Sequence, residues 1–232
     1  MLFKNRVDAG KQLALKVEHY LCGIDKRIPR SHFVVVGLPR GGVPVALEVS
    51  RRLGCPLEVI VSKKLPFPNE PEYAIGAVCT GAIVVLNPEI PKSSEWNEYI
   101  ERQKQALLAS VQSREDEFYL MAGKHRTSIE EKTAIIVDDG IATGMTALAA
   151  IEAARKRGAS KVIMAAPIVS KESDLLLRRY CDDVLALCIP ETFDSVGRYY
   201  NDFKPTTDEE VVKALAESNN SEDCPNNLKS AS

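Results

Sequence analysis

Two adjacent carboxylates, Asp138 and Asp139, stand between a short apolar run and a glycine-rich turn. The apolar run, Ile135–Val137, is β-branched throughout, which is typical of a strand buried on both faces of a sheet. Gly140 and Gly144 allow the backbone of the turn to approach a ligand closely, and the start of the next helix directs free N–H groups outward. This arrangement predicts a turn that binds phosphate.

The two acids narrow the kind of ligand that such a turn would bind. A site for phosphate alone should not place carboxylates beside it, because like charges repel. Carboxylates next to a phosphate turn suit a ligand that also presents hydroxyl groups, such as the vicinal diol of a ribose 5-phosphate. The alternative is an ordinary strand-to-helix turn in which Asp139 and Thr143 serve only as turn and cap residues.

Residues 135–147 resemble the 5-phosphoribosyl-1-pyrophosphate (PRPP) motif of type I phosphoribosyltransferases in the apolar run, both acids and the Ala-Thr-Gly-x-Thr turn. Neither a P-loop nor a G-x-G-x-x-G dinucleotide motif fits these glycines. The resemblance implies transfer of the 5-phosphoribosyl group of PRPP to a nitrogenous base or related acceptor, with release of pyrophosphate. It implies that Asp138 and Asp139 are catalytic residues. The implied substrate-binding residues of the turn are Gly140, Ile141, Ala142, Thr143, Gly144, Met145 and Thr146.

A second turn with anion-binding character follows the first predicted strand, Phe33–Gly37. It places Arg40 between Pro39 and the pair Gly41 and Gly42, ahead of a helix over 44–53. A guanidinium fork and bare backbone N–H groups suit the oxygens of pyrophosphate, although a plain strand–helix connector has the same composition. In the family that the chain resembles, this position holds the pyrophosphate loop, and Arg40 is therefore predicted to be a third catalytic residue.

The next strand is predicted over 57–62 and ends in Lys63 and Lys64, which would meet the pyrophosphate or remain solvated. Three prolines follow within six residues, at 66, 68 and 71. This segment should form neither a regular helix nor a central strand, and it is a candidate mobile flap. Apolar runs around Thr80-Gly81 predict a hairpin over 74–87.

The remaining pattern predicts an open, mainly parallel five-stranded sheet with helices on both faces, like that of the type I phosphoribosyltransferases. Arg6, on a first helix over 2–21 that ends before Gly23, is interpreted as a solvated helix arginine. We expect one domain over 1–217 and a disordered polar tail over 218–232. A long helix or bent pair of helices is inserted over 93–123 and is expected to have no chemical role. An aromatic segment over 190–205 either packs against the domain or forms a hood over the site. The other expected elements are helices over 145–157, 174–180 and 207–217 and strands over 162–169 and 184–189.

Bulk composition excludes several classes of protein. The net charge of −2 and pI of about 6.0 give no general attraction to nucleic acid or to membranes, and no apolar run is long enough to span a bilayer. The six cysteines are scattered and indicate reduced thiols of a cytoplasmic protein. The three isolated histidines predict no protein metal site, and Mg²⁺ is expected to arrive mainly with PRPP. A homodimer is expected.

A single position, Ala142, bears on the identity of the acceptor base. In relatives that act on 6-oxopurines, an acidic residue at this position of the turn handles a proton on the purine ring, which alanine cannot do. Hypoxanthine and guanine are therefore expected to be poor acceptors, and adenine, uracil and orotate remain open. Lys171 is a weak candidate contact with the acceptor. The alternative function is a non-catalytic protein that senses PRPP or a nucleotide on the same fold.

Overall fold

The computed structural model describes residues 2–24, 28–67, 70–87 and 94–219. Its central sheet has five parallel strands in the order β2-β1-β6-β7-β8, which confirms the predicted fold class. The strands of this sheet are β1 (Phe33–Gly37), β2 (Leu57–Val59), β6 (Thr133–Val137), β7 (Lys161–Ile168) and β8 (Asp183–Cys188). Both neighbours of β6 run parallel to it, so the carboxyl ends of β1, β6 and β7 meet at one edge.

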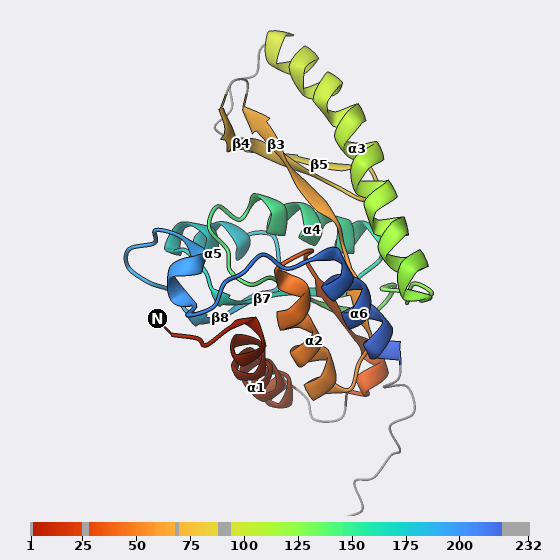
Figure 1. The fold of residues 1–232 in the computed structure, drawn as a ribbon, viewed down its shortest axis with the longest axis vertical. Helices are drawn as coiled ribbons and strands as arrows, with labels where there is room; N and C mark the ends of the chain where they lie inside the picture. Colours follow the sequence, from red (N-terminus) through yellow and green to blue (C-terminus); the bar gives the residue numbers. More distant parts are fainter. Residues whose placement is uncertain (1, 25–27, 68–69, 88–93, 220–232) are drawn as a thin grey trace, which may run out of the picture.

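Helices cover both faces of the central sheet, as Figure 1 shows. Successive side chains of a strand point to opposite faces, so Val35 and Ile135 pack under one layer of helices while Val36 and Ile136 pack under the other. The first layer contains α1 (Arg6–Ile24), α2 (Gly42–Leu53) and α6 (Asp208–Asn219), and the second contains α4 (Met145–Lys156) and α5 (Lys171–Leu177).

A three-stranded antiparallel sheet, in the order β3-β4-β5, stands out from the main body with the long helix α3 beside it (Figure 1). Its elements are β3 (Ser62–Phe67), β4 (Glu70–Cys79), β5 (Ile83–Leu86) and α3 (Ser94–Ala122). The strand predicted over 57–62 is thus wrong in part, because the chain leaves the main sheet after Val59 and enters the small one at Ser62. Within the segment predicted over 93–123, α3 is one continuous helix rather than a bent pair.

The segment around Pro66 and Pro71, predicted to form neither a regular helix nor a central strand, contributes to two strands of the small sheet, β3 with the first proline and β4 with the second. The sheet tolerates these prolines because β3 is an edge strand and its pairing shifts register on both sides of Pro66. Near Pro71, β4 has only β3 as a neighbour, as β5 pairs with it from Gly76 onward. Residue 68 of the predicted flap lies outside the described residues.

Buried charges fix α3 to the root of the small sheet. The Glu115 carboxylate accepts hydrogen bonds from the Val61 backbone N–H at 3.0 Å, the Thr80 hydroxyl at 2.7 Å and the Arg157 guanidinium at 2.9 Å. Its side chain is 2% exposed. Because a buried carboxylate without partners is costly, this network holds α3 and the start of β3 in a fixed relation.

The other predicted elements are confirmed with shifted bounds, and α1 runs through Gly23 to Ile24. Two short 3₁₀ helices, η1 (Arg30–His32) and η2 (Val196–Tyr199), interrupt the connectors. Among the described helices, none combines the length and the apolar character needed to cross a bilayer. The predicted polar tail lies outside the described residues from position 220 onward.

Candidate functional site

The two predicted anion-binding turns lie in contact at the carboxyl edge of the sheet. The Leu38 N–H donates to the carbonyl oxygen of Val137 at 2.9 Å, which joins the ends of β1 and β6. A Cβ atom on Gly42 would lie 2.6 Å from that same oxygen, and one on Gly41 would lie 2.0 Å from Oδ2 of Asp139. Only glycine fits this approach, so the residue type at both positions follows from the proximity of the acids.

Asp138 and Asp139 form a partly buried pair at the end of β6. The backbone N–H of Asp139 donates to Oδ1 of Asp138 at 2.9 Å. Burial, together with the neighbouring carboxylate of Asp139, raises the pKa of Asp138 well above its usual value. Burial also raises the pKa of Asp139, although the charge of Arg6 opposes that shift. Both carboxyls therefore hold a proton more readily than exposed aspartates do, and Arg6 offsets the charge of Asp139.

Arg6 is not the solvated helix arginine that the sequence predicts. Its Nε donates to Oδ2 of Asp139 at 2.7 Å, and its side chain is 12% exposed. One terminal nitrogen donates to the carbonyl oxygen of Lys204 at 2.7 Å, and the guanidinium carbon lies 3.9 Å from the centroid of the Phe203 ring. No local pattern could reveal a contact between residues 133 positions apart.

Residues at the start of α5 fix the orientation of the turn after β6. The carbonyl oxygen of Ala142 accepts hydrogen bonds from the hydroxyls of Ser170 at 2.7 Å and Ser173 at 2.8 Å. In a trans peptide the N–H points opposite to the C=O, so the Thr143 N–H faces away from α5. Gly144, with φ of 73°, caps α4 without a side chain, and the first N–H groups of that helix have no intrahelical partner. The geometry is that of an anion-binding turn; the two serines carry no sequence signal for this role.

The aromatic segment over 190–205 packs against the acids from the other side. The Tyr200 hydroxyl donates to the backbone oxygen of Asp139 at 2.6 Å, and its ring is buried between Phe3 and Phe203. A Cβ atom on Gly140 would lie 2.4 Å from the Val196 side chain. Tyr200 is therefore a packing residue, whereas the neighbouring Phe193 and Tyr199 remain partly exposed.

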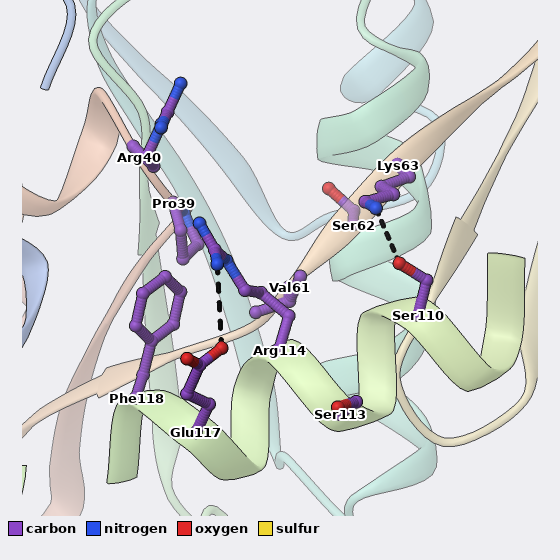
Figure 2. Close-up of a pocket in the computed structure, with 10 residues that line it drawn as sticks. All are labelled: Pro39, Arg40, Val61, Ser62, Lys63, Ser110, Ser113, Arg114, Glu117 and Phe118. Carbon is purple, nitrogen blue, oxygen red and sulfur yellow. Dashed lines mark hydrogen bonds and ion pairs between the residues drawn. The ribbon is translucent and has the colours of Figure 1, made fainter. Parts of the chain in front are cut away.

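A cleft of about 620 Å³ opens beside the Arg40 turn, between that turn, the root of β3 and the middle of α3. The Pro39–Arg40 peptide bond at its rim is cis. Figure 2 shows Lys63 against α3, where its Nζ donates to the Ser110 hydroxyl at 2.6 Å. The other residues that line the cleft are Val61, Ser62, Ser113, Arg114, Glu117 and Phe118.

This cleft bears on the predicted roles of Lys63, Lys64 and the long helix, whereas Lys171 lies elsewhere. Lys63 belongs to it, whereas Lys64 is exposed and does not line it. The helix over 94–122, predicted to have no chemical role, forms one wall of the cleft. Lys171 is exposed at the start of α5 and pairs with Glu191 at 3.1 Å.

The comparisons with known proteins agree with this geometry. A family model described as phosphoribosyl transferase domain matches residues 4–203. Two curated proteins of Mycobacterium tuberculosis, from strains CDC 1551 and H37Rv, carry the provisional name phosphoribosyl transferase and are each 39% identical to the chain over 218 residues. The match covers 92% of this chain and 46% of each relative, so the chain spans about half the length of these relatives.

Among solved structures, TT1426 from Thermus thermophilus has a similar fold, with a TM-score of 0.77 and 34% sequence identity. The similarity covers 94% of this chain and 99% of that one. The family model and these relatives match the region that contains both turns, the two acids and the sheet that positions them. The chain is a member of the phosphoribosyl transferase domain family.

Proposed function

We propose that the protein is a phosphoribosyltransferase that moves the 5-phosphoribosyl group of PRPP to a nitrogenous base or related acceptor and releases pyrophosphate. One observation carries the proposal: the Arg40 turn, the two aspartates and the Thr143 turn lie side by side along one sheet edge. That order matches the order of pyrophosphate, ribose diol and 5-phosphate in PRPP. Ligands of open α/β sheets bind at this edge.

In this mechanism, cleavage of the bond at C1 builds positive charge on the ribose and negative charge on the leaving pyrophosphate. Asp138 and Asp139 would accept hydrogen bonds from the diol and supply a negative field beside the ring. Backbone N–H groups over 143–146 would bind the 5-phosphate. Arg40, assisted by Lys63, would stabilise the pyrophosphate.

Magnesium would enter as a complex with PRPP. Among the described residues there is no group of three or more His, Cys, Asp or Glu side chains that could hold a metal ion. Mg²⁺ commonly keeps several waters and binds through substrate phosphates with one or two carboxylates, which suits the pair of acids at the sheet edge. When bound, it would neutralise the charge of the pyrophosphate.

The test is titration calorimetry with PRPP and Mg²⁺ on the parent and on the double variant Asp138→Asn/Asp139→Asn. The substitutions keep shape and remove charge; because Asp139→Asn also removes the partner of the buried Arg6, the single variant Asp138→Asn serves as the comparison. Each lost bond to a charged group should cost on the order of 1.5–3 kcal/mol of binding free energy. A double variant that binds PRPP as tightly as the parent would exclude the diol role.

The acceptor can be narrowed with kinetics on a panel of bases. Ala142 is exposed in the phosphate turn and can neither accept nor donate a proton through its side chain. General acid–base catalysis contributes about 10²–10⁴-fold when a group is positioned for it, so guanine and hypoxanthine should have low kcat/KM. The proposal about the acceptor fails if either of them has the highest kcat/KM of the panel.

A further inference from the structure

The cleft beside the Arg40 turn contains an arrangement that the proposed function does not use. Arg114, on α3, also lines the cleft, and Figure 2 shows its side chain extending from the helix in the direction of Pro39. The lining residues comprise three cations, Arg40, Lys63 and Arg114, and one acid, Glu117. Glu117 lies 3.6 Å from a terminal nitrogen of Arg114, and Asp208 pairs with both arginines, so the cations here exceed the acids by one. This net positive charge should attract a multiply charged anion.

A single oxygen atom already contacts both arginines. Oδ1 of Asp208, at the start of α6, pairs with a terminal nitrogen of Arg114 and lies 3.7 Å from a terminal nitrogen of Arg40. The two guanidinium groups, from α3 and from the turn after β1, thus converge on one point. An oxyanion placed there would meet both forks.

We propose that Arg114 is a second anion-binding arginine of the site, and that Asp208 competes with the pyrophosphate group for Arg40 and Arg114. This inference rests on the proposed function, because it assigns the pyrophosphate end of PRPP to this cleft. The inserted helix then supplies a residue that contacts the substrate, and the start of α6 sets how tightly the leaving group is held.

These side chains are exposed enough for pyrophosphate to replace Asp208. The side chains of Arg40, Arg114 and Asp208 are 51%, 33% and 34% exposed, so solvent screens their pairing and water can replace each partner. Pyrophosphate offers more charge and more oxygen atoms than one carboxylate. It can therefore displace Asp208 without leaving an unpaired charge in the interior.

Asp208 is also replaceable without loss of its helix. Thr207 caps α6, since its hydroxyl accepts from the Glu210 N–H at 3.3 Å while the Glu210 carboxylate accepts from the Thr207 N–H at 2.8 Å. Asp208 takes no part in this capping box. The variant Asp208→Asn should keep α6 intact and remove one of the two carboxylates that pair with Arg114, while Glu117 remains.

The experiment titrates inorganic pyrophosphate and, separately, ribose 5-phosphate into the full chain, followed by calorimetry. Arg114→Gln should weaken pyrophosphate binding about tenfold or more and leave ribose 5-phosphate unchanged. Arg114→Lys, which keeps the charge, should recover part of the loss. Arg102→Gln, an exposed arginine on the same helix outside the cleft, is the matched control and should behave as the parent.

Asp208→Asn should act in the opposite direction and tighten pyrophosphate binding about two- to fivefold, since an exposed pair is worth at most ~1 kcal/mol. The inference is overturned if Arg114→Gln binds pyrophosphate like the parent, or if Asp208→Asn leaves the affinity unchanged or lowers it. Binding of pyrophosphate through Arg114 without any binding of PRPP would instead contradict the proposed function alone.

Discussion

Two ion pairs join distant segments to the candidate site, and they differ in burial. Arg6 and Asp139, with side chains 12% and 14% exposed, meet below the sheet edge and are enclosed by Phe203 and Tyr200. Arg114 and Asp208, at 33% and 34%, meet at the mouth of the cleft. The first pair is shielded from water, whereas the second is screened by it.

The difference indicates a division of roles. A buried pair is costly to break, because removal of one partner leaves the other charge in a medium that solvates it poorly. Arg6 therefore holds the Asp139 carboxylate in one orientation. The exposed pair gains little from its own contact, so its arginines stay available to a competing anion. The buried pair therefore fixes the orientation of Asp139, whereas the exposed pair can exchange its carboxylate for another anion.

The largest effect is expected for Arg6→Ala, which leaves Asp139 buried without its partner. The free energy of unfolding should fall by about 3 kcal/mol. Urea denaturation followed by circular dichroism measures it. Arg51→Ala is the control, since Arg51 pairs with Glu48 and Glu217 at the surface and is 51% exposed. Equal losses for the two variants would show that burial does not separate the pairs.

A smaller loss is expected for Gly41→Ala. Its Cβ would lie 2.0 Å from Oδ2 of Asp139 and 3.3 Å from Nε of Arg6, so the methyl group would wedge the buried pair apart. Such overpacking costs about 1–3 kcal/mol of unfolding free energy. Gly23→Ala, in the last turn of α1 with no described atom within 4 Å of the added Cβ, should instead be neutral or slightly stabilising. Thermal and urea unfolding should both find Gly41→Ala less stable than Gly23→Ala. If Gly41→Ala were as stable as the parent, the Asp139 side chain would be able to move aside at little cost.

Asp138 differs from Asp139 in that it forms no ion pair with an arginine among the described residues. Its pKa is raised in the folded protein above 3.8, so its contribution to stability is complete below about pH 3.8 and is lost as pH rises through the folded pKa. Asp138→Asn should therefore be more stable than the parent at pH 7, and the gap should close in acid. The gain should be about 1.4 kcal/mol for each pH unit by which the folded pKa exceeds the unfolded one.

Unfolding measured between pH 4 and pH 7 tests that trend. The exposed Asp116 is the control of opposite sign, because a hydrogen bond from Arg126 lowers its pKa. Asp116→Asn should lose a little stability above pH 3.8 and nothing in acid. If the free energy of unfolding changed with pH in the same direction for both variants, burial would not be the cause of the raised pKa of Asp138.

The smallest effect is expected for Asp208→Asn on stability. The free energy of unfolding should change by less than about 1 kcal/mol, and the change should vanish in about 1 M salt because the pair is screened. Urea unfolding at low and high ionic strength measures this. A salt-independent loss comparable to that of Arg6→Ala would place the Asp208 pair in the buried class.

Local chemistry made the centre of the site predictable from the sequence. The run ending in Val137, the acids and the glycines that follow are contiguous, and a strand–turn–helix of that composition has few alternatives. The parallel sheet followed from the alternation of strands and helices. The second turn could be placed beside the first because parallel strands end at the same edge.

The missed features depend on contacts between distant residues. Arg6 and Tyr200 reach Asp139 across 133 and 61 positions, and a helical arginine or a loop tyrosine has the same local pattern whether it is solvated or buried. Arg114 lies in an ordinary amphipathic helix whose place against β3 is fixed by the buried Glu115. Val59 and Ser62 look like parts of one strand, although they pair in different sheets.

The contact of Arg6 with Lys204 joins residues 198 positions apart, and the Phe3 strand bridge to Tyr200 lies beside it. On a ribosome, β1, β6 and both turns emerge well before these residues, but the environment of Asp139 could not yet be completed. Closing so long a loop is also entropically costly and slow. During synthesis, the two turns should thus form before Asp139 acquires the surroundings that Arg6 and the segment around Lys204 provide.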